Sequence, residues 1–216
     1  EKDECKWPGT SLGESSDICR TEGVGTVLWF SPERVTHVSD LCANFSYEKV
    51  WAVAADGYIY SNIGDKDCFE WTLNRITTAM DEGGADVYRE YIDINPAGAW
   101  EVLDLREENS CGHPRSGISE KKCVTAHYEL WDRIIEFCAS KGKCTFIDNF
   151  ASEGSRCDIE SLRRSIPVFV TDRETLTSDM ALSRTVAVNK WFPFSGYISV
   201  GNDLFDARAS LVPVLN

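Results

Sequence analysis

Cysteine content constrains this chain more than any other feature. The 216 residues include nine cysteines, all between Cys5 and Cys157, and no two stand at the two-residue spacing of zinc-binding pairs. Such a density is typical of chains that form disulfides in an oxidising compartment. We therefore expect a disulfide-stabilised protein that is secreted and extracellular.

The number of cysteines leaves their pairing open. Eight cysteines can pair in about 105 ways, and the ninth would stay a thiol or join another chain. Cys111 with Cys123, and Cys138 with Cys144, are close enough in sequence to form local loops. A glycosylation sequon at Asn44 and a first residue other than methionine agree with a processed secretory glycoprotein.

Charge and hydrophobicity narrow the choice of partners. The net charge is −13, with 22 basic and 35 acidic residues. We expect no nucleic-acid partner, because phosphate binding needs concentrated positive charge. No apolar run of the sequence is long enough to span a bilayer. Apolar residues make up 43% of the chain, enough to build a core that disulfides would reinforce.

We predict one domain over residues 1–216. Residues 1–23 are polar and rich in glycine and serine, which predicts an irregular N-terminal arm tethered by disulfides at Cys5 and Cys19. The Ser-Pro-Glu sequence at 31–33 predicts the start of a helix. Apolar spacing predicts further helices at 69–80 and within 123–142, and a short helix or turn at 158–165. It also predicts strands at 25–30, 50–54, 58–61, 87–94, 168–170, 186–188 and 197–200, a strand or turn at 100–105, and loops at 106–122 and 148–157.

These predicted elements do not alternate regularly between strand and helix. A doubly wound parallel sheet needs that alternation. We therefore expect an α+β fold: a mainly antiparallel sheet, whole or split, with several helices and with disulfides that stabilise it. No internal repeat and no shift in composition marks a second domain.

Few residues indicate chemistry on their own. The three histidines, His37, His113 and His127, stand in no zinc motif, so we expect no metal site. A serine-histidine-aspartate triad or a cysteine nucleophile stays open, because both are recognised by geometry and environment. The most suggestive acidic pair is Asp158 and Glu160, whose structural alternative is an ordinary helix N-terminus with acids near its dipole.

Five segments also occur in a suggestive order. They are the strand and turn of 27–35, the strand of 57–62, the helix of 69–80, the strand of 87–96 and the acidic segment of 158–167. In this order they resemble the ADP-ribosyltransferase fold of the cholera-, pertussis- and heat-labile-enterotoxin type, which has secreted fungal relatives.

The resemblance implies where a site would lie. The implied catalytic residues are Glu160, Asp158 and Ser61, and the implied cofactor-binding residues are Trp29, Arg34 and Tyr60. Trp29 stands where the family has an arginine that holds the phosphates of NAD, and an indole cannot make bidentate charged contacts. The resemblance therefore implies a scaffold that has lost NAD-dependent transfer and holds no cofactor.

Three functions follow, in order of preference. The first is a toxin-like virulence effector without enzymatic activity that binds a host or competitor protein. The second is an active ADP-ribosyltransferase or NAD glycohydrolase with NAD as cofactor. The third is a secreted hydrolase or carbohydrate-binding protein of another fold, which would use exposed aromatic side chains among Trp7, Trp51, Trp100 and Trp191.

Overall fold

The computed structural model describes residues 5–36, 41, 51–91, 94–143, 145–150, 156 and 158–166, and single residues between 177 and 204. Two compact units divide the chain. Unit 1 comprises Glu1–Tyr88 and Asp93–Thr145, and unit 2 comprises Arg89–Ile92 and Phe146–Asn216. The single domain expected from the sequence stays a prediction.

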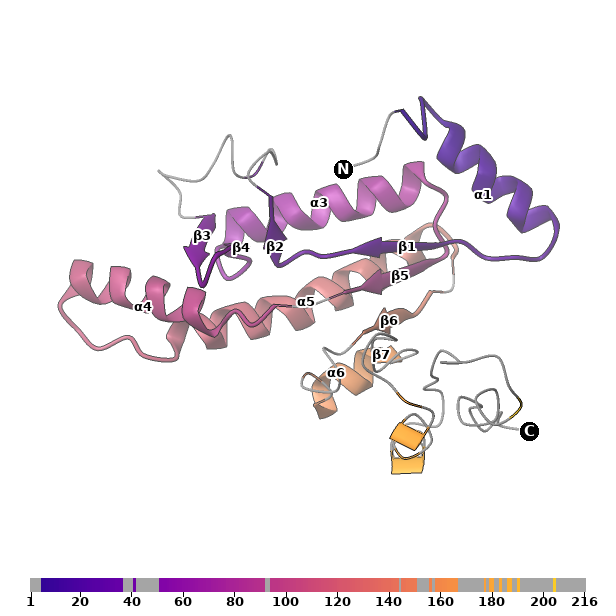
Figure 1. Cartoon of the computed structure of the whole chain (residues 1–216). Helices are drawn as coiled ribbons and strands as arrows, with labels where there is room; N and C mark the ends of the chain where they lie inside the picture. Colours follow the sequence, from indigo (N-terminus) through magenta and orange to yellow (C-terminus); the bar gives the residue numbers. More distant parts are fainter. Residues whose placement is uncertain are drawn as a thin grey trace. The chain divides into compact units, whose positions relative to one another are not determined.

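Helices and strands are interspersed along the described residues (Figure 1). The helices are α1 (Ser11–Thr21), α3 (Lys66–Glu82), α4 (Ala97–Cys111), α5 (Ile118–Ser140) and α6 (Ile159–Arg164). The strands are β1 (Val27–Phe30), β2 (Arg34–Val35), β3 (Ala52–Ala55), β4 (Tyr58–Ser61), β5 (Val87–Glu90), β6 (Ile147–Asn149) and β7 (Ser165–Ile166).

The larger sheet has four strands in the order β1-β5-β6-β7, which is also their order in the chain. β6 and β7 pair in parallel, with Ile147 opposite Ser165. Helices lie between successive strands of this sheet in the sequence, as the crossovers between parallel strands require. This mostly parallel sheet with helical crossovers contradicts the predicted α+β fold with a mainly antiparallel sheet.

The wrong fold class has a physical cause in helix α4. Residues 100–105 were expected to form a strand or turn and 106–122 a loop, but they belong to α4, to the start of α5 and to the turn between them. Leu103 is buried whereas Leu105 is 58% exposed, so apolar residues of α4 do not gather on one face. Because the apolar residues of α4 lack the helical period, the sequence pattern did not reveal the helix that precedes α5 between strands of the larger sheet.

The smaller sheet is antiparallel, in the order β2-β4-β3. β3 and β4 form the predicted hairpin, and Asp56 and Gly57 at its turn have φ values of 51° and 80°, as a tight two-residue turn requires. The helix does not begin at residue 31 as predicted, whereas Leu41, on its expected apolar face, is helical and residues 37–40 and 42 lie outside the described residues. Arg34 instead pairs with Tyr60 in β2, and the backbone N–H of Ser61 donates to the carbonyl of Glu33 at 2.9 Å.

Helix α3 confirms the prediction for residues 69–80. Its N-cap is Asp65, whose side chain accepts hydrogen bonds from the N–H groups of Asp67 and Cys68 at 3.0 Å. The residues expected on its apolar face are all buried: Phe69, Leu73, Ile76 and Met80. Helix α5 buries four of the five residues expected on its apolar face, Leu130, Trp131, Ile134 and Cys138, whereas Phe137 is half-buried. The helix begins earlier than predicted.

The N-terminal segment is helical where an irregular arm was expected. The Ser16 hydroxyl in α1 donates to the carbonyl of Gly83 at 2.5 Å, and Arg20 contacts Asp86 at 3.2 Å. These two contacts attach α1 to the end of α3 and to the residues before β5. The disulfide expected to tether this segment at Cys19 is contradicted, because Cys19 carries a free thiol.

The expected disulfide framework is contradicted for the described cysteines. Cys19, Cys68, Cys111, Cys123 and Cys138 are free thiols. Three of them are buried in helices, where a cysteine behaves as a small hydrophobic residue. Cysteine number alone does not separate this packing role from a covalent one. Cys144, the expected partner of Cys138, lies outside the described residues.

The remaining predictions fall late in the chain. The short helix at 158–165 is confirmed as α6, whereas part of the predicted loop at 148–157 is strand β6. Val186 and Ala187, expected in a strand, are helical, and the strands expected at 168–170 and 197–200 lie outside the described residues. None of the described helices is both long and apolar enough to cross a membrane.

Candidate functional site

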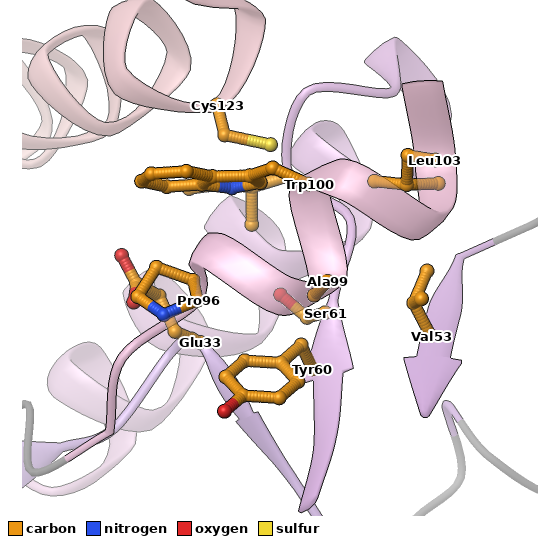
Figure 2. A pocket seen from close by; sticks show the side chains of 10 residues that line it. Glu33, Val53, Tyr60, Ser61, Pro96, Ala99, Trp100, Leu103 and Cys123 are labelled. Carbon is orange, nitrogen blue, oxygen red and sulfur yellow. The ribbon is translucent and has the colours of Figure 1, made fainter. Parts of the chain in front are cut away.

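A small cavity in unit 1 is lined by polar and apolar side chains from both strands of the hairpin, β3 and β4, and from α4 and α5 (Figure 2). Its lining residues are Glu33, Val53, Tyr60, Ser61, Ile63, Pro96, Ala99, Trp100, Leu103 and Cys123. The cavity measures about 10 Å³, which is room for about one water molecule. As it stands, the cavity cannot hold an organic substrate.

The polar contacts around this cavity tie the loop after β1 to its neighbours. Glu33 is 7% exposed, and its carboxylate lies 3.4 Å from Nδ1 of His127 on α5. The Ser61 hydroxyl donates to the carbonyl of Pro32 at 2.8 Å. The His127 ring packs edge-on against Trp131, with centroids 4.6 Å apart. These contacts hold β4, α5 and the loop together, which is a structural role.

The buried thiols of unit 1 are poor nucleophiles. Burial raises the pKa of Cys68 to about 12 and that of Cys123 to about 11, and the negative charge of Glu33 adds to the effect on Cys123. Burial also raises the pKa of Cys138. Because the thiolate is the attacking species, these three residues do not supply the cysteine nucleophile that the sequence left open.

Unit 2 contains a charged pair on two strands of the larger sheet. Nη1 of Arg89 on β5 lies 3.0 Å from Oδ2 of Asp148 on β6. Their side chains are 18% and 6% exposed, so solvent screens the pair only weakly. A buried carboxylate is stable as an ion only with such a partner. The pair therefore places the negative charge of the Asp148 carboxylate beside the N–H donors of the Arg89 guanidinium.

Strand alternation separates this pair from two other polar residues. Successive side chains of a strand point to opposite faces. Glu90, the last residue of β5, is 0% exposed, and Asn149, the last residue of β6, is 1% exposed. They face the side of the strands opposite Arg89 and Asp148, and nothing from solvent reaches them there.

An aromatic pair follows the charged pair beyond the strand ends. The rings of Tyr91 and Phe150 lie 4.6 Å apart at an angle of 48°. The backbone N–H of Phe150 donates to the carbonyl of Glu90 at 3.0 Å, which fixes the two chain segments side by side. We call Arg89, Tyr91, Asp148 and Phe150 the β5–β6 face; it joins ionic, hydrogen-bonding and aromatic groups in one place.

The acidic pair singled out in the sequence has the contacts of a helix start. Asp158 caps α6 and accepts hydrogen bonds from the N–H groups of Glu160 and Ser161 at 2.8 and 3.0 Å. Glu160 pairs with Arg164 at 2.6 Å and with Arg163 at 3.1 Å. The hydrogen bond from Arg164 is the main cause that lowers the pKa of Glu160. The catalytic role of this acidic pair stays a prediction.

The other predicted site residues lie in unit 1. Tyr60 and Ser61 line the cavity, and the Tyr60 hydroxyl donates to the carbonyl of Asn95 at 2.9 Å. Burial is the main cause that raises the pKa of Tyr60. Arg34 stands opposite Tyr60 in the small sheet. Trp29 is on β1 of the other sheet and is 60% exposed, so the small sheet gathers three of these four residues but not Trp29.

The tryptophans named for the third function differ in exposure. Trp7 is 37% exposed, whereas Trp51 is buried at 5%. Trp100 is half-buried and lines the small cavity, and Trp191 lies outside the described residues. None of the three described tryptophans belongs to the β5–β6 face. No group of three or more metal-ligating side chains occurs in the described part of the chain.

Sequence comparison gives no relatives: no family model matches the chain, and no curated protein matches it. Solved structures do match. An α-galactosidase from Lactobacillus brevis has a TM-score of 0.64 at 15% identity, over 93% of this chain and 26% of that one. A GH36 α-galactosidase, AgaA from Geobacillus stearothermophilus in complex with stachyose, has a TM-score of 0.69 at 12% identity. The match covers 97% of this chain and 30% of AgaA.

The fold of this chain is similar to that of part of several α-galactosidases. Aspergillus fumigatus Ega3 in complex with galactosamine is a further match, with a TM-score of 0.50 at 9% identity over 87% of this chain and 80% of that one. The chain spans less than a third of the length of the α-galactosidases it resembles. At these identities the likeness concerns the fold.

These matches correct the resemblance drawn from the sequence. The structural neighbours are α-galactosidases and Ega3, so the assignment to the ADP-ribosyltransferase family is wrong, and with it the toxin-like effector on that scaffold. The order of short segments misled because strands, hairpins and capped helices recur in many folds. The third function, a carbohydrate-active protein of another fold, agrees better with the glycosidase fold.

Sequence reasoning missed the residues of the β5–β6 face. The signal was present, since Arg89 interrupts an apolar strand and Asp148 follows Phe146 and Ile147. A charge inside a buried strand needs a partner. The sequence does not say which partner, because residues 89 and 148 meet only through the order of strands in the sheet.

Proposed function

We propose that this chain is a glycoside hydrolase domain that acts on galacto-configured α-glycosides, with the β5–β6 face as its sugar site. The glycosidase fold supports the reaction class, and the matched α-galactosidases suggest the sugar. The observation that carries the site is the Arg89–Asp148 pair on neighbouring strands of a mostly parallel sheet. In barrels built from such strands, catalytic residues come from their carboxyl ends.

The chemistry of the pair fits a sugar. Arg89 donates only, and Asp148 in its ionised form accepts only. A sugar hydroxyl does both, so one hydroxyl can accept from the guanidinium while its neighbour donates to the carboxylate. Because the pair is largely shielded from water, these hydrogen bonds lose little to solvent competition. Asp148 is also placed to stabilise the positive charge that develops on the ring during glycoside cleavage.

A second candidate is a galactoside-binding protein without hydrolysis. Glycosidases use two carboxyl groups on either side of the scissile bond. Of the residues that the structure describes, the β5–β6 face carries one carboxylate, that of Asp148. Recognition of a sugar needs no second carboxyl group, so this observation favours binding alone.

Hydrolysis of p-nitrophenyl α-galactoside separates the two candidates. We expect the wild-type chain to release nitrophenol and Asp148→Asn to lose about 100-fold or more in kcat/KM, as when a charged transition-state contact is removed. Glu129→Gln, a change of an acid on α5 whose side chain is 57% exposed, should stay within about twofold of wild type. Binding without release in calorimetry would support the second candidate. Neither binding nor release would contradict both.

A further inference from the structure

The aromatic pair of the β5–β6 face has two unlike members. Phe150 is 5% exposed and is part of the interior, whereas Tyr91 is half-buried. The contact between their rings at 4.6 Å gives Tyr91 a buried neighbour on one side. Tyr91 as a residue is therefore partly exposed to solvent, with its ring in contact with a buried side chain.

One backbone hydrogen bond beside Tyr91 and one ring contact restrain this residue without a ligand. The hydrogen bond from the N–H of Phe150 to the carbonyl of Glu90 holds the segment after β6 against the residue directly before Tyr91. A tyrosine has two side-chain torsions, and contact with Phe150 restricts them. A ligand that packs on Tyr91 would thus meet a surface already in place, which lowers the entropic cost of binding.

The two pairs of this face follow each other along the strands. Arg89 and Tyr91 are two residues apart on one segment, and Asp148 and Phe150 are two residues apart on the next, so each couple is on the same face. A ligand that spans both pairs would meet charged hydrogen-bonding groups at one edge and an aromatic surface beside it. Ligand sites commonly combine an apolar lining with a few placed polar groups.

A pyranose in the galacto configuration has a matching pair of surfaces. Its axial hydroxyl at C4 leaves the hydrogens of C3, C4 and C5 together on one face, which forms a compact apolar patch. Its hydroxyls project from the edges of the ring. The gluco epimer has an equatorial C4 hydroxyl and distributes its C–H groups over both faces.

We propose that Tyr91 is the platform on which the C–H face of a galacto-configured sugar packs, and that it contributes to the choice of galacto over gluco sugars. The inference rests on the proposed function, because it takes the β5–β6 face as the sugar site. Arg89 and Asp148 bind the hydroxyl edge in this arrangement, and Phe150 positions the platform from behind. Tyr91 is a binding residue and takes no part in bond cleavage.

The test is calorimetric titration of the full chain with 1-deoxygalactonojirimycin and with its gluco epimer. We expect Tyr91→Ala to weaken binding of the galacto compound about tenfold or more and to reduce its preference over the gluco compound, since an aromatic surface is lost. Tyr91→Phe keeps the surface and should stay within about threefold of wild type. Tyr58→Ala, which changes a tyrosine 45% exposed in unit 1, is the matched control and should bind as wild type.

A measurement on the wild-type chain covers the case in which Tyr91→Ala does not fold. Saturation-transfer NMR should show the strongest transfer to the hydrogens at C3, C4 and C5 of the galacto ring. Even transfer over the ring, or unchanged binding in a folded Tyr91→Ala, would overturn the platform while leaving the proposed function in place. If the wild-type chain binds neither sugar and hydrolyses no α-galactoside, both proposals fall together.

Discussion

Asp104 shows how one residue can join two helices. Its carboxylate, on α4, accepts hydrogen bonds from the N–H groups of Gly117 at 2.7 Å and Ser119 at 2.9 Å, at the start of α5. Burial alone would raise the pKa of Asp104, but the hydrogen bonds from Ser119, Gly117 and Ile118 outweigh it and lower that pKa. The first turn of α5 thus receives its cap from another helix.

This cap should make stability depend on pH. A lowered folded-state pKa contributes stability above the unfolded value, about 3.9, that is lost as pH falls through the folded value. We expect Asp104→Asn to lower the free energy of unfolding by about 1–2 kcal/mol at pH 7 and to lose less stability than wild type between pH 5 and 3. Urea unfolding at several pH values measures both effects. Glu101 is an exposed residue of α4, and Glu101→Gln should leave the dependence of stability on pH as in wild type. Identical pH profiles for wild type, Asp104→Asn and Glu101→Gln would contradict the capping role of Asp104.

The cysteines give a second prediction for single residues. Cys111 is exposed, whereas burial raises the pKa of Cys68 to about 12 and of Cys123 to about 11. In the native chain at pH 8, Cys111 should react with Ellman's reagent at the rate of a small thiol, and the two buried thiols should react only after urea unfolding. Peptide mapping by mass spectrometry after timed quenching assigns each rate. Modification of Cys68 in the native chain as fast as Cys111, or absence of Cys111 labelling, would argue against the described environments.

Single residues also mark the limit of prediction from sequence. The Asp65 cap and the Asp56-Gly57 turn involve neighbours in the chain, so local reasoning can find them. The Arg89–Asp148 pair joins residues 59 positions apart. The sequence shows that each of these charges needs a partner, but only the assembled sheet selects which partner.

At the scale of elements, the contact of α1 with α3 depends on a small residue. A side-chain carbon added at Gly13 would lie 2.6 Å from the backbone oxygen of Glu82. Backbone atoms cannot move aside as a flexible side chain does. Alanine favours helices over glycine by about 1 kcal/mol. The steric overlap with the backbone oxygen of Glu82 should outweigh this gain, so the substitution should lower the free energy of unfolding.

We therefore expect Gly13→Ala to destabilise the chain by about 1–3 kcal/mol, the usual cost of overpacking. The thermal midpoint should fall accordingly, and amide hydrogens of α1 should exchange faster with solvent. Asp17→Ala changes a side chain of α1 that is 73% exposed and serves as the control, with a change below about 0.5 kcal/mol. Stabilisation by Gly13→Ala would mean that helix propensity dominates and that α1 does not pack as described.

Helices and strands differ in how clearly the sequence pattern predicts them. Helix α3 combines a side-chain cap with four buried apolar residues at helical spacing, and it was predicted within a few residues. Helix α4 has neither a side-chain cap nor a consistent apolar face. Strand β6 is three residues long, with burial on both faces, and shows no alternation for a sequence pattern to detect.

At the scale of the whole molecule, two missed elements changed the fold class. With α4 and β6 absent, the sequence reads as an irregular series of strands and helices, which favours an antiparallel sheet. With both present, strands of the larger sheet follow in chain order with helices between them. That order brings Arg89 and Asp148 to neighbouring strands, so the fold error and the missed site have one cause.

The central claim is that the β5–β6 face binds a galacto-configured sugar. A crystal structure of the chain with 1-deoxygalactonojirimycin tests it most directly. The account predicts the sugar within hydrogen-bond distance of Arg89 and Asp148, with its C–H face against the Tyr91 ring. A sugar bound elsewhere, for example in an enlarged cavity beside Glu33 and Trp100, would contradict it.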